Sequence, residues 1–82
     1  MKQYVCGAKQ VLAGLKNETL QAVYIAKEAD LDLLKEIVKL ATESNVEIIY
    51  KDTLQEVGKL CNIDVGSAAS GLIKEVKKIA NS

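Results

Sequence analysis

The sequence of 82 residues contains no histidine, arginine, tryptophan, phenylalanine or proline. Without histidine, the chain lacks imidazole as a general base, as the partner of a nucleophile and as a metal ligand, which excludes most familiar catalytic and zinc sites. Cysteine, lysine and carboxylate side chains remain, but no two of them are spaced as a catalytic pair. Without tryptophan and phenylalanine, aromatic platforms for single-stranded nucleic acid are not expected. We therefore predict no catalytic residue, no metal ligand and no cofactor.

Long apolar runs are missing as well. No run approaches the roughly 20 residues that a membrane-spanning helix needs, and no signal peptide opens the chain. We therefore expect no membrane partner and a cytoplasmic location. Hydrophobic residues make up 49% and charged residues 27%, which is typical of a soluble globular protein. A chain of this length can bury one hydrophobic core, so residues 1–82 are predicted to form a single domain.

Cysteine is scarce. Cys6 and Cys61 lie far apart in the sequence and form no CxxC motif. Because no export signal is present, two reduced and buried thiols are the expected state. The sequence alone leaves a disulfide between them open.

Neither sign of charge is in excess, since 11 lysines balance 11 acids, but the distribution is uneven. Residues 1–17 carry three lysines and no acid, for a charge of +3. Residues 28–56 carry eight acids against three lysines, for −5, and residues 57–82 carry four lysines against two acids, for +2. A non-specific binder of polyanions would be basic throughout. Any contact with nucleic acid must therefore be local, through both ends of the chain.

The chain alternates between the apolar patterns of strands and of helices. Short or continuous apolar stretches predict strands at residues 3–6, 22–26 and 46–50. Apolar residues at helical spacing predict helices that cover residues 8–16, run from Asp30 to about Ser44, and begin at Thr53. This alternation predicts the α/β class, with a three-layer α/β/α sandwich.

Three details of this pattern carry further predictions. Asn17 and Asn62 are placed to end two of the helices. Gly14 lies inside the first helix, where glycine costs about 1 kcal/mol relative to alanine, so we expect close packing there. Residues 69–79 fit one long helix, but Ser70-Gly71 interrupts it, so a strand before Leu72 stays open.

The first candidate site is Gly7-Ala8-Lys9-Gln10, at a predicted strand-to-helix junction. Glycine allows a ligand to approach the backbone closely, and a helix start offers free amides and a positive dipole end to phosphate. Lys9 adds a mobile charge, and Gln10 adds an amide that can donate and accept at base edges. The alternative is an ordinary helix start with solvated polar residues.

Two further segments are candidate sites. The segment 62–66 places Ile63 and Val65 in a loop, where they either turn into the core or await a partner such as an unstacked base. The segment 26–30 follows a strand and contains Glu28 and Asp30, with Asp32 close by. These carboxylates could bind a divalent cation, but helix capping explains them better.

Residues 7–10 read Gly-Ala-Lys-Gln, residues 23–30 read Val-Tyr-Ile-Ala-Lys-Glu-Ala-Asp, and residues 57–69 read Val-Gly-Lys-Leu-Cys-Asn-Ile-Asp-Val-Gly-Ser-Ala-Ala. In this order, the three segments resemble motifs of the ribosomal L-seven-Ae family, whose members bind kink-turns in RNA. The family versions are Gly-Thr-Lys-Gln or Gly-Thr-Asn-Glu, then Ile-Ala-x-Asp-Ala-Asp, then Leu-Gly-x-x-x-Gly-Ile-x-Val-Gly-Ala-Ala. The resemblance covers residues 4–73 and is strongest to small bacterial members.

This resemblance implies a mixed sheet of about four strands, with residues 68–73 as an inner strand. It implies that the glycine-led helix start contacts the sheared G·A pairs of a kink-turn, and that the loop 63–65 covers a flipped-out nucleotide. Ala8 replaces the family's threonine, and Ala13 replaces a lysine whose charge Lys16 can partly supply. The RNA-binding residues predicted in this way are Gly7, Ala8, Lys9, Gln10, Lys16, Lys27, Glu28, Ile63, Asp64 and Val65.

The predicted function is therefore RNA binding without catalysis. The expected partner is structured RNA with a kink-turn, either ribosomal RNA or a regulatory RNA, and ribosome association is expected. The oligomeric state is left open, with a monomer as the working expectation. The alternative is a protein–protein interaction adaptor on the same fold, which would present the acidic residues 28–56 to a basic partner.

Overall fold

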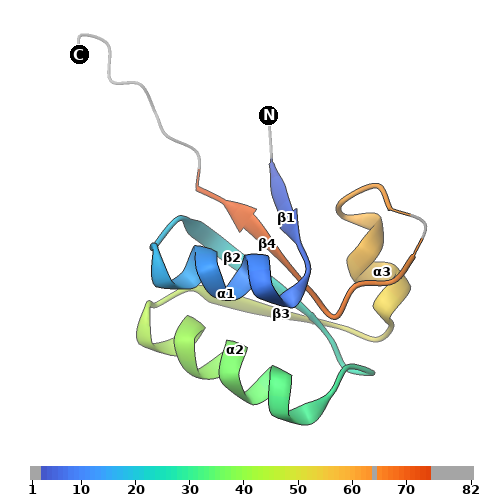
Figure 1. The fold of residues 1–82 in the computed structure, drawn as a ribbon, viewed down its shortest axis with the longest axis horizontal. Helices are drawn as coiled ribbons and strands as arrows, with labels where there is room; N and C mark the ends of the chain where they lie inside the picture. The colour runs from blue at the N-terminus through green and yellow to red at the C-terminus, as the bar shows by residue number, and fades with distance from the viewer. Residues whose placement is uncertain (1–2, 64, 75–82) are drawn as a thin grey trace, which may run out of the picture.

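Four strands form one mixed sheet in the order β1-β4-β2-β3 (Figure 1). The computed structural model describes residues 3–63 and 65–74. Its elements along the chain are β1 (Tyr4–Cys6), α1 (Ala8–Lys16), β2 (Leu20–Ala26), α2 (Leu31–Glu43), β3 (Glu47–Lys51), α3 (Leu54–Lys59) and β4 (Ala69–Ile73). The predicted α/β class and four-stranded mixed sheet are confirmed. No helix among these described residues is long and apolar enough to cross a membrane.

Strand β4 lies between β1 and β2 and is antiparallel to both, whereas β2 and β3 are parallel. The Gly7 amide donates to the Ala69 carbonyl at 2.9 Å, and the Ala26 amide donates to the Ala68 carbonyl at 3.0 Å. The last residues of β1 and β2 therefore lie beside the start of β4, and the last residue of β3 pairs with the end of β2, so all of them lie along one end of the sheet. We call this end the carboxyl edge. It brings together the loops that contain all three candidate segments.

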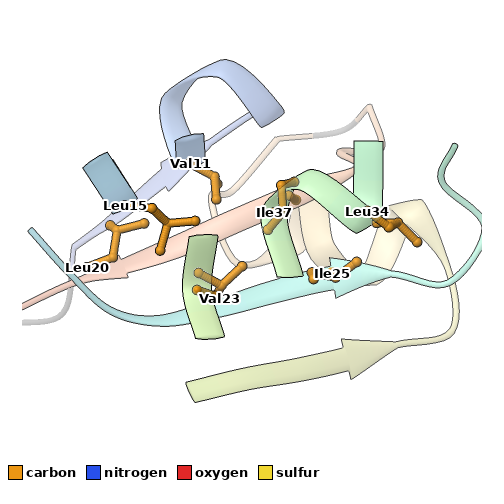
Figure 2. Close-up of a cluster of buried hydrophobic side chains, with 9 residues drawn as sticks. Val11, Leu15, Leu20, Val23, Ile25, Leu34 and Ile37 are labelled. Atoms are coloured by element: carbon orange, nitrogen blue, oxygen red, sulfur yellow. The ribbon is translucent and has the colours of Figure 1, made fainter. Parts of the chain in front are cut away.

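The sheet is covered on both faces. On one face, Val23 and Ile25 of β2 pack in a buried cluster with residues of α1 and α2 (Figure 2). On the other face, the buried Ser70 hydroxyl donates to the Val57 carbonyl of α3 at 3.1 Å. Alternate residues of a strand point to opposite faces, and Ala69 belongs to the first cluster, so α3 lies opposite α1 and α2. This is the predicted three-layer arrangement.

The face that carries α3 also holds an aromatic pair. The ring centroids of Tyr4 and Tyr24 are 6.0 Å apart, and the Lys51 Nζ lies 6.0 Å from the Tyr24 centroid. Burial raises the pKa of Tyr24 above its ordinary value of 10.0, and the neighbouring Tyr4 adds to this effect. The Tyr24 hydroxyl is therefore neutral at physiological pH.

The helix ends follow the predicted signals. The Asp30 carboxylate caps α2 by accepting from the Asp32 amide at 2.8 Å, and the Thr53 hydroxyl caps α3 by accepting from the Glu56 amide at 3.2 Å. Asn17 is the residue at which α1 ends. Asn62 follows α3 with a φ of 59°, which is the left-handed conformation expected of it.

Residues 69–73 form the inner strand β4, so the long helix considered for this region is wrong over these residues. Val76 and Ile79, which also belonged to that helical pattern, lie outside the described residues. These residues form a strand and not a helix because Ala69, Ser70 and Gly71 are small. They can be buried between two neighbouring strands and between the helices on the two faces of the sheet. An inner strand of this kind has no alternation of polar and apolar residues, so its pattern resembles that of a buried helix.

Candidate functional site

The start of α1 is open to a ligand. Gly7 precedes the helix with a φ of 97° and a ψ of 146°, a conformation that is essentially restricted to glycine. Apart from its two chain neighbours, no residue has a heavy atom within 4 Å of a Cβ atom placed on Gly7. No side chain caps this helix start, so its first amides are available for an acceptor. Lys9 and Gln10 are exposed beside it, and the half-buried Ala8 packs against the core.

The loop 62–66 lies against α3 and keeps two apolar side chains exposed. Ile63 is 36% exposed and Val65 is 71% exposed, so of the two alternatives left open, the one in which they turn into the core is wrong. The reason is that the loop backbone packs directly against α3. A Cβ atom on Gly58 of α3 would lie 2.6 Å from the Val65 carbonyl oxygen. The Ser67 amide also donates to the Leu54 carbonyl at 3.0 Å. Asp64 lies outside the described residues.

The two segments lie side by side because the residues that precede them are in contact. Cys6, directly before Gly7, and Cys61, directly before Asn62, are joined by a disulfide, and their Cα atoms are 6.3 Å apart. The expectation of two separate, reduced thiols is therefore contradicted. The structure brings the glycine-led helix start and the apolar loop to the same end of the sheet.

Lys27 and Glu28 also lie at the carboxyl edge, where each contacts a residue near the start of α3. The Lys27 ammonium lies 3.5 Å from the Asp52 carboxylate, an exposed ion pair that adds little stability. The Glu28 carboxylate accepts from the Leu54 amide at 2.7 Å, at the start of α3. The β2–α2 turn is thus joined to the helix that carries the apolar loop. No group of acidic or cysteine side chains suited to a metal ion occurs among the described residues.

We expect Glu28→Ala to lower the free energy of unfolding by about 1 kcal/mol, because the Leu54 amide loses its charged acceptor at a helix start. Glu28→Gln keeps an acceptor oxygen and should cost less. Urea denaturation of both variants measures the effect. Glu36→Ala is the matched control, because Glu36 is an exposed carboxylate inside α2. Equal losses for Glu28→Ala and Glu36→Ala would show that the bond to Leu54 contributes nothing.

Lys16 is the predicted site residue that lies farthest along α1 from the helix start. It is in the last turn of the helix, about 10 Å from Lys9 along the helix axis at 1.5 Å per residue. Seven residues are close to two helical turns, so Lys9 and Lys16 share one exposed face. The structure therefore separates Lys16 from the carboxyl edge but keeps it on the same exposed face of α1 as Lys9.

Ser70 was not singled out from the sequence, although it lies at the centre of this region. Its hydroxyl oxygen is 3.7 Å from both cysteine sulfur atoms, and Cys6 is its register partner across β1 and β4. A lone serine in a small-residue strand carries no signal. The two cysteines did carry a signal in the sequence, because each directly precedes a candidate segment.

The fold and the residues at the carboxyl edge define the class of protein. It is a small α/β domain in which an uncapped helix start with a lysine lies beside an exposed apolar loop. The chain belongs to the Ribosomal protein L7Ae/L30e/S12e/Gadd45 family, because the sequence model of that family matches residues 1–81. The resemblance noted in the sequence is thereby confirmed.

Curated relatives share most of their length with this chain. An RNA-binding protein from Caldanaerobacter subterraneus is 42% identical over 66 residues, which are 80% of each chain. An RNA-binding protein from Halalkalibacterium halodurans is 39% identical over 70 residues, 85% of each chain. The RNA-binding protein YbxF from Geobacillus stearothermophilus is 34% identical over 70 residues, also 85% of each. These names agree with the prediction of a non-enzymatic protein.

A solved structure shares the fold at low sequence identity. The 15.5kD RNA binding protein of Giardia lamblia superposes with a TM-score of 0.81 at 19% identity, over 88% of this chain and 61% of that one. A protein of unknown function from Bacillus halodurans superposes with a TM-score of 0.78 at 16% identity, over 90% and 73%.

Proposed function

We propose that this protein binds RNA and that it recognises and stabilises kink-turns. The observation that carries the proposal is the open helix start at Gly7, beside the exposed loop 62–66, in a chain whose relatives are named RNA-binding proteins. Each of the three motifs that resemble the kink-turn-binding family extends to this one edge. The predicted RNA-binding residues stay a prediction that the experiments below address.

The helix start supplies two kinds of contact in this proposal. Its free amides and positive dipole end attract phosphate or an acceptor on a base. The Lys9 ammonium neutralises a phosphate, and the Gln10 amide can donate and accept at the edge of a purine. Gly7 lets the nucleic-acid backbone come close, because the space beside its Cα is empty.

The loop supplies the second part of the binding surface. Ile63 and Val65 offer exposed apolar area of the kind that an unstacked base can cover. The loop backbone packs closely against Gly58 of α3, which fixes the position of the loop on that helix. A bent RNA that presents paired purines to the helix and one extruded base to the loop would meet both segments at once, whereas a straight duplex would meet only one.

Stabilisation of the kink follows from this difference in contacts. A protein that binds only the bent RNA shifts the equilibrium toward it by the difference between its affinities for the two forms. Because the chain is neutral overall, non-specific attraction to phosphate is weak. The proposal therefore predicts recognition by shape, with few released counterions and a shallow dependence on salt.

The test compares a kink-turn RNA with a control in which the tandem G·A pairs are changed to G·C. We expect the affinity for the kink-turn to be higher by about tenfold or more, which corresponds to roughly 1.4 kcal/mol. Mobility shift measures affinity, and fluorescence transfer between labelled RNA arms measures bending. Equal binding to both RNAs, or no binding at micromolar protein, would contradict the proposal. Ribosome association is part of it, and sequencing of RNA recovered with the protein from cells tests that part.

A further inference from the structure

We infer that Cys6 and Cys61 form a reversible thiol–disulfide site that controls RNA binding at the carboxyl edge. This inference rests on the proposed function. The partner it requires is a small disulfide or dithiol of the surrounding redox pool. The oxidised form is the one that binds RNA tightly, and reduction weakens binding.

The position of the pair connects it to both halves of the binding surface. Cys6 is the last residue of β1 and directly precedes Gly7 at the start of α1. Cys61 follows α3 and is two residues before Ile63 in the apolar loop. Their Cα separation of 6.3 Å lies within the range that disulfides require. A bond between them joins the helix start to the loop by the shortest covalent route.

Strand β1 has three residues and is one of the two outer strands of the sheet. Among the described strands it pairs only with β4, while its side chains contact Tyr24 and the core cluster. In this disulfide form, the space beside Gly7 is open and Val65 is exposed, so the bond leaves the binding surface accessible. The disulfide therefore acts by fixing the two segments relative to each other. A surface that is ordered before binding loses less conformational freedom when RNA binds.

Ser70 allows the pair to exist in both redox forms. Its hydroxyl gives its single proton to the Val57 carbonyl and keeps two lone pairs. Its oxygen is 3.7 Å from each cysteine sulfur. After reduction, each thiol has a weak acceptor within reach, so neither S–H group is left without a partner. A buried hydroxyl in this position therefore offers a hydrogen-bond acceptor to both thiols of the reduced state.

The chemical step is thiol–disulfide exchange with a low-molecular-weight disulfide. A thiolate of one cysteine attacks the small disulfide, whose S–S bond breaks to release one small thiol and leave a mixed disulfide. The second cysteine then attacks the protein sulfur of that mixed disulfide, which forms the Cys6–Cys61 bond and releases the second small thiol. The two cysteines lose two protons and two electrons, and the small disulfide gains both. A dithiol reductant reverses the sequence.

The experiment uses the full chain, oxidised with glutathione disulfide or reduced with a phosphine. Free thiols are counted by alkylation and mass spectrometry, melting temperature is measured by circular dichroism, and kink-turn RNA binding is measured by fluorescence anisotropy. We expect the oxidised monomer to have no free thiol and to melt on the order of 10 °C higher than the reduced one. We expect its RNA dissociation constant to be about tenfold lower.

The variants Cys6→Ser and Cys61→Ser are the controls. Both should bind RNA as the reduced protein does and should not respond to reductant. Thiols that stay free in the folded chain, bonds that form only between chains, or equal RNA affinity of the two redox forms would overturn the inference. If the thiols pair and the melting temperature rises but neither form prefers kink-turn RNA, the proposed function fails and control of RNA binding fails with it. The thiol count and melting curve then still establish the disulfide.

Discussion

Leu20→Ala is expected to lower the free energy of unfolding by about 3 kcal/mol or more, because it removes a fully buried side chain and leaves a cavity. Leu20 is 1% exposed and lies at the start of β2 (Figure 2). Its side chain fits between two glycines of different elements. A Cβ atom on Gly14 of α1 would lie 2.7 Å from the Leu20 Cγ, and one on Gly71 of β4 would lie 2.6 Å from its Cδ1.

The same contact predicts whether a second substitution raises or lowers the stability of the protein. Gly14→Ala improves helix propensity by about 1 kcal/mol, but in the native chain the added methyl group collides with Leu20, so we expect a net loss of stability. In the Leu20→Ala background the obstruction is gone and the cavity can take the methyl group. There we expect Gly14→Ala to stabilise the protein by up to about 1 kcal/mol.

Urea denaturation of the four proteins, all in one redox state, gives the coupling free energy of this cycle. Ala13→Gly is the matched control, because Ala13 is exposed on the same helix and reports propensity without packing. If Gly14→Ala stabilises the native chain, or if its effect is the same in both backgrounds, the contact between Leu20 and Gly14 does not explain this glycine.

Lys9→Ala combined with Gln10→Ala is expected to weaken kink-turn binding by about a hundredfold, with about tenfold from each substitution. Both side chains are exposed at the start of α1 and belong to no buried cluster. The melting temperature should therefore stay nearly unchanged. Lys9→Ala should also reduce the slope of log affinity against log salt by about one counterion, whereas Gln10→Ala should leave that slope unchanged.

The control for the lost charge is Lys39→Ala. Lys39 is exposed on α2 and lies with Tyr50 of β3 around a surface pocket. Strand β3 is the outer strand of the sheet that lies farthest from β1. Its removal changes net charge as Lys9→Ala does but should leave RNA affinity within about twofold. Equal losses for Lys9→Ala and Lys39→Ala would mean that the RNA responds to overall charge and not to the helix start.

The elements that could be predicted from the sequence are those whose signals are local. Helix α1 begins after Gly7 and ends before Asn17 as expected, because its apolar spacing, its glycine and its terminal asparagine all lie within one segment. The Asp30 and Thr53 caps were predictable for the same reason, since each side chain bonds to an amide two or three residues away.

The features that could not be predicted depend on contacts between distant residues. The Glu28 carboxylate bonds to the amide of a residue 26 positions later, and Cys6 meets Cys61 across 55 positions. The exposure of Ile63 and Val65 depends on how closely the loop approaches Gly58. The spacing of apolar residues in the sequence does not indicate that distance. The candidate segments were recognisable as motifs, but the bonds that connect them appear only when the strands are placed in order.

The strand order also has a consequence for how this protein is made. Strand β1 pairs only with β4 among the described strands, and their register partners are 64 to 68 residues apart in the chain. During synthesis, the first strand therefore stays without this partner until residues 69–73 have left the ribosomal exit tunnel. The nascent chain cannot complete this end of the sheet before that point, so we expect the proposed RNA site to form only after β4 has emerged.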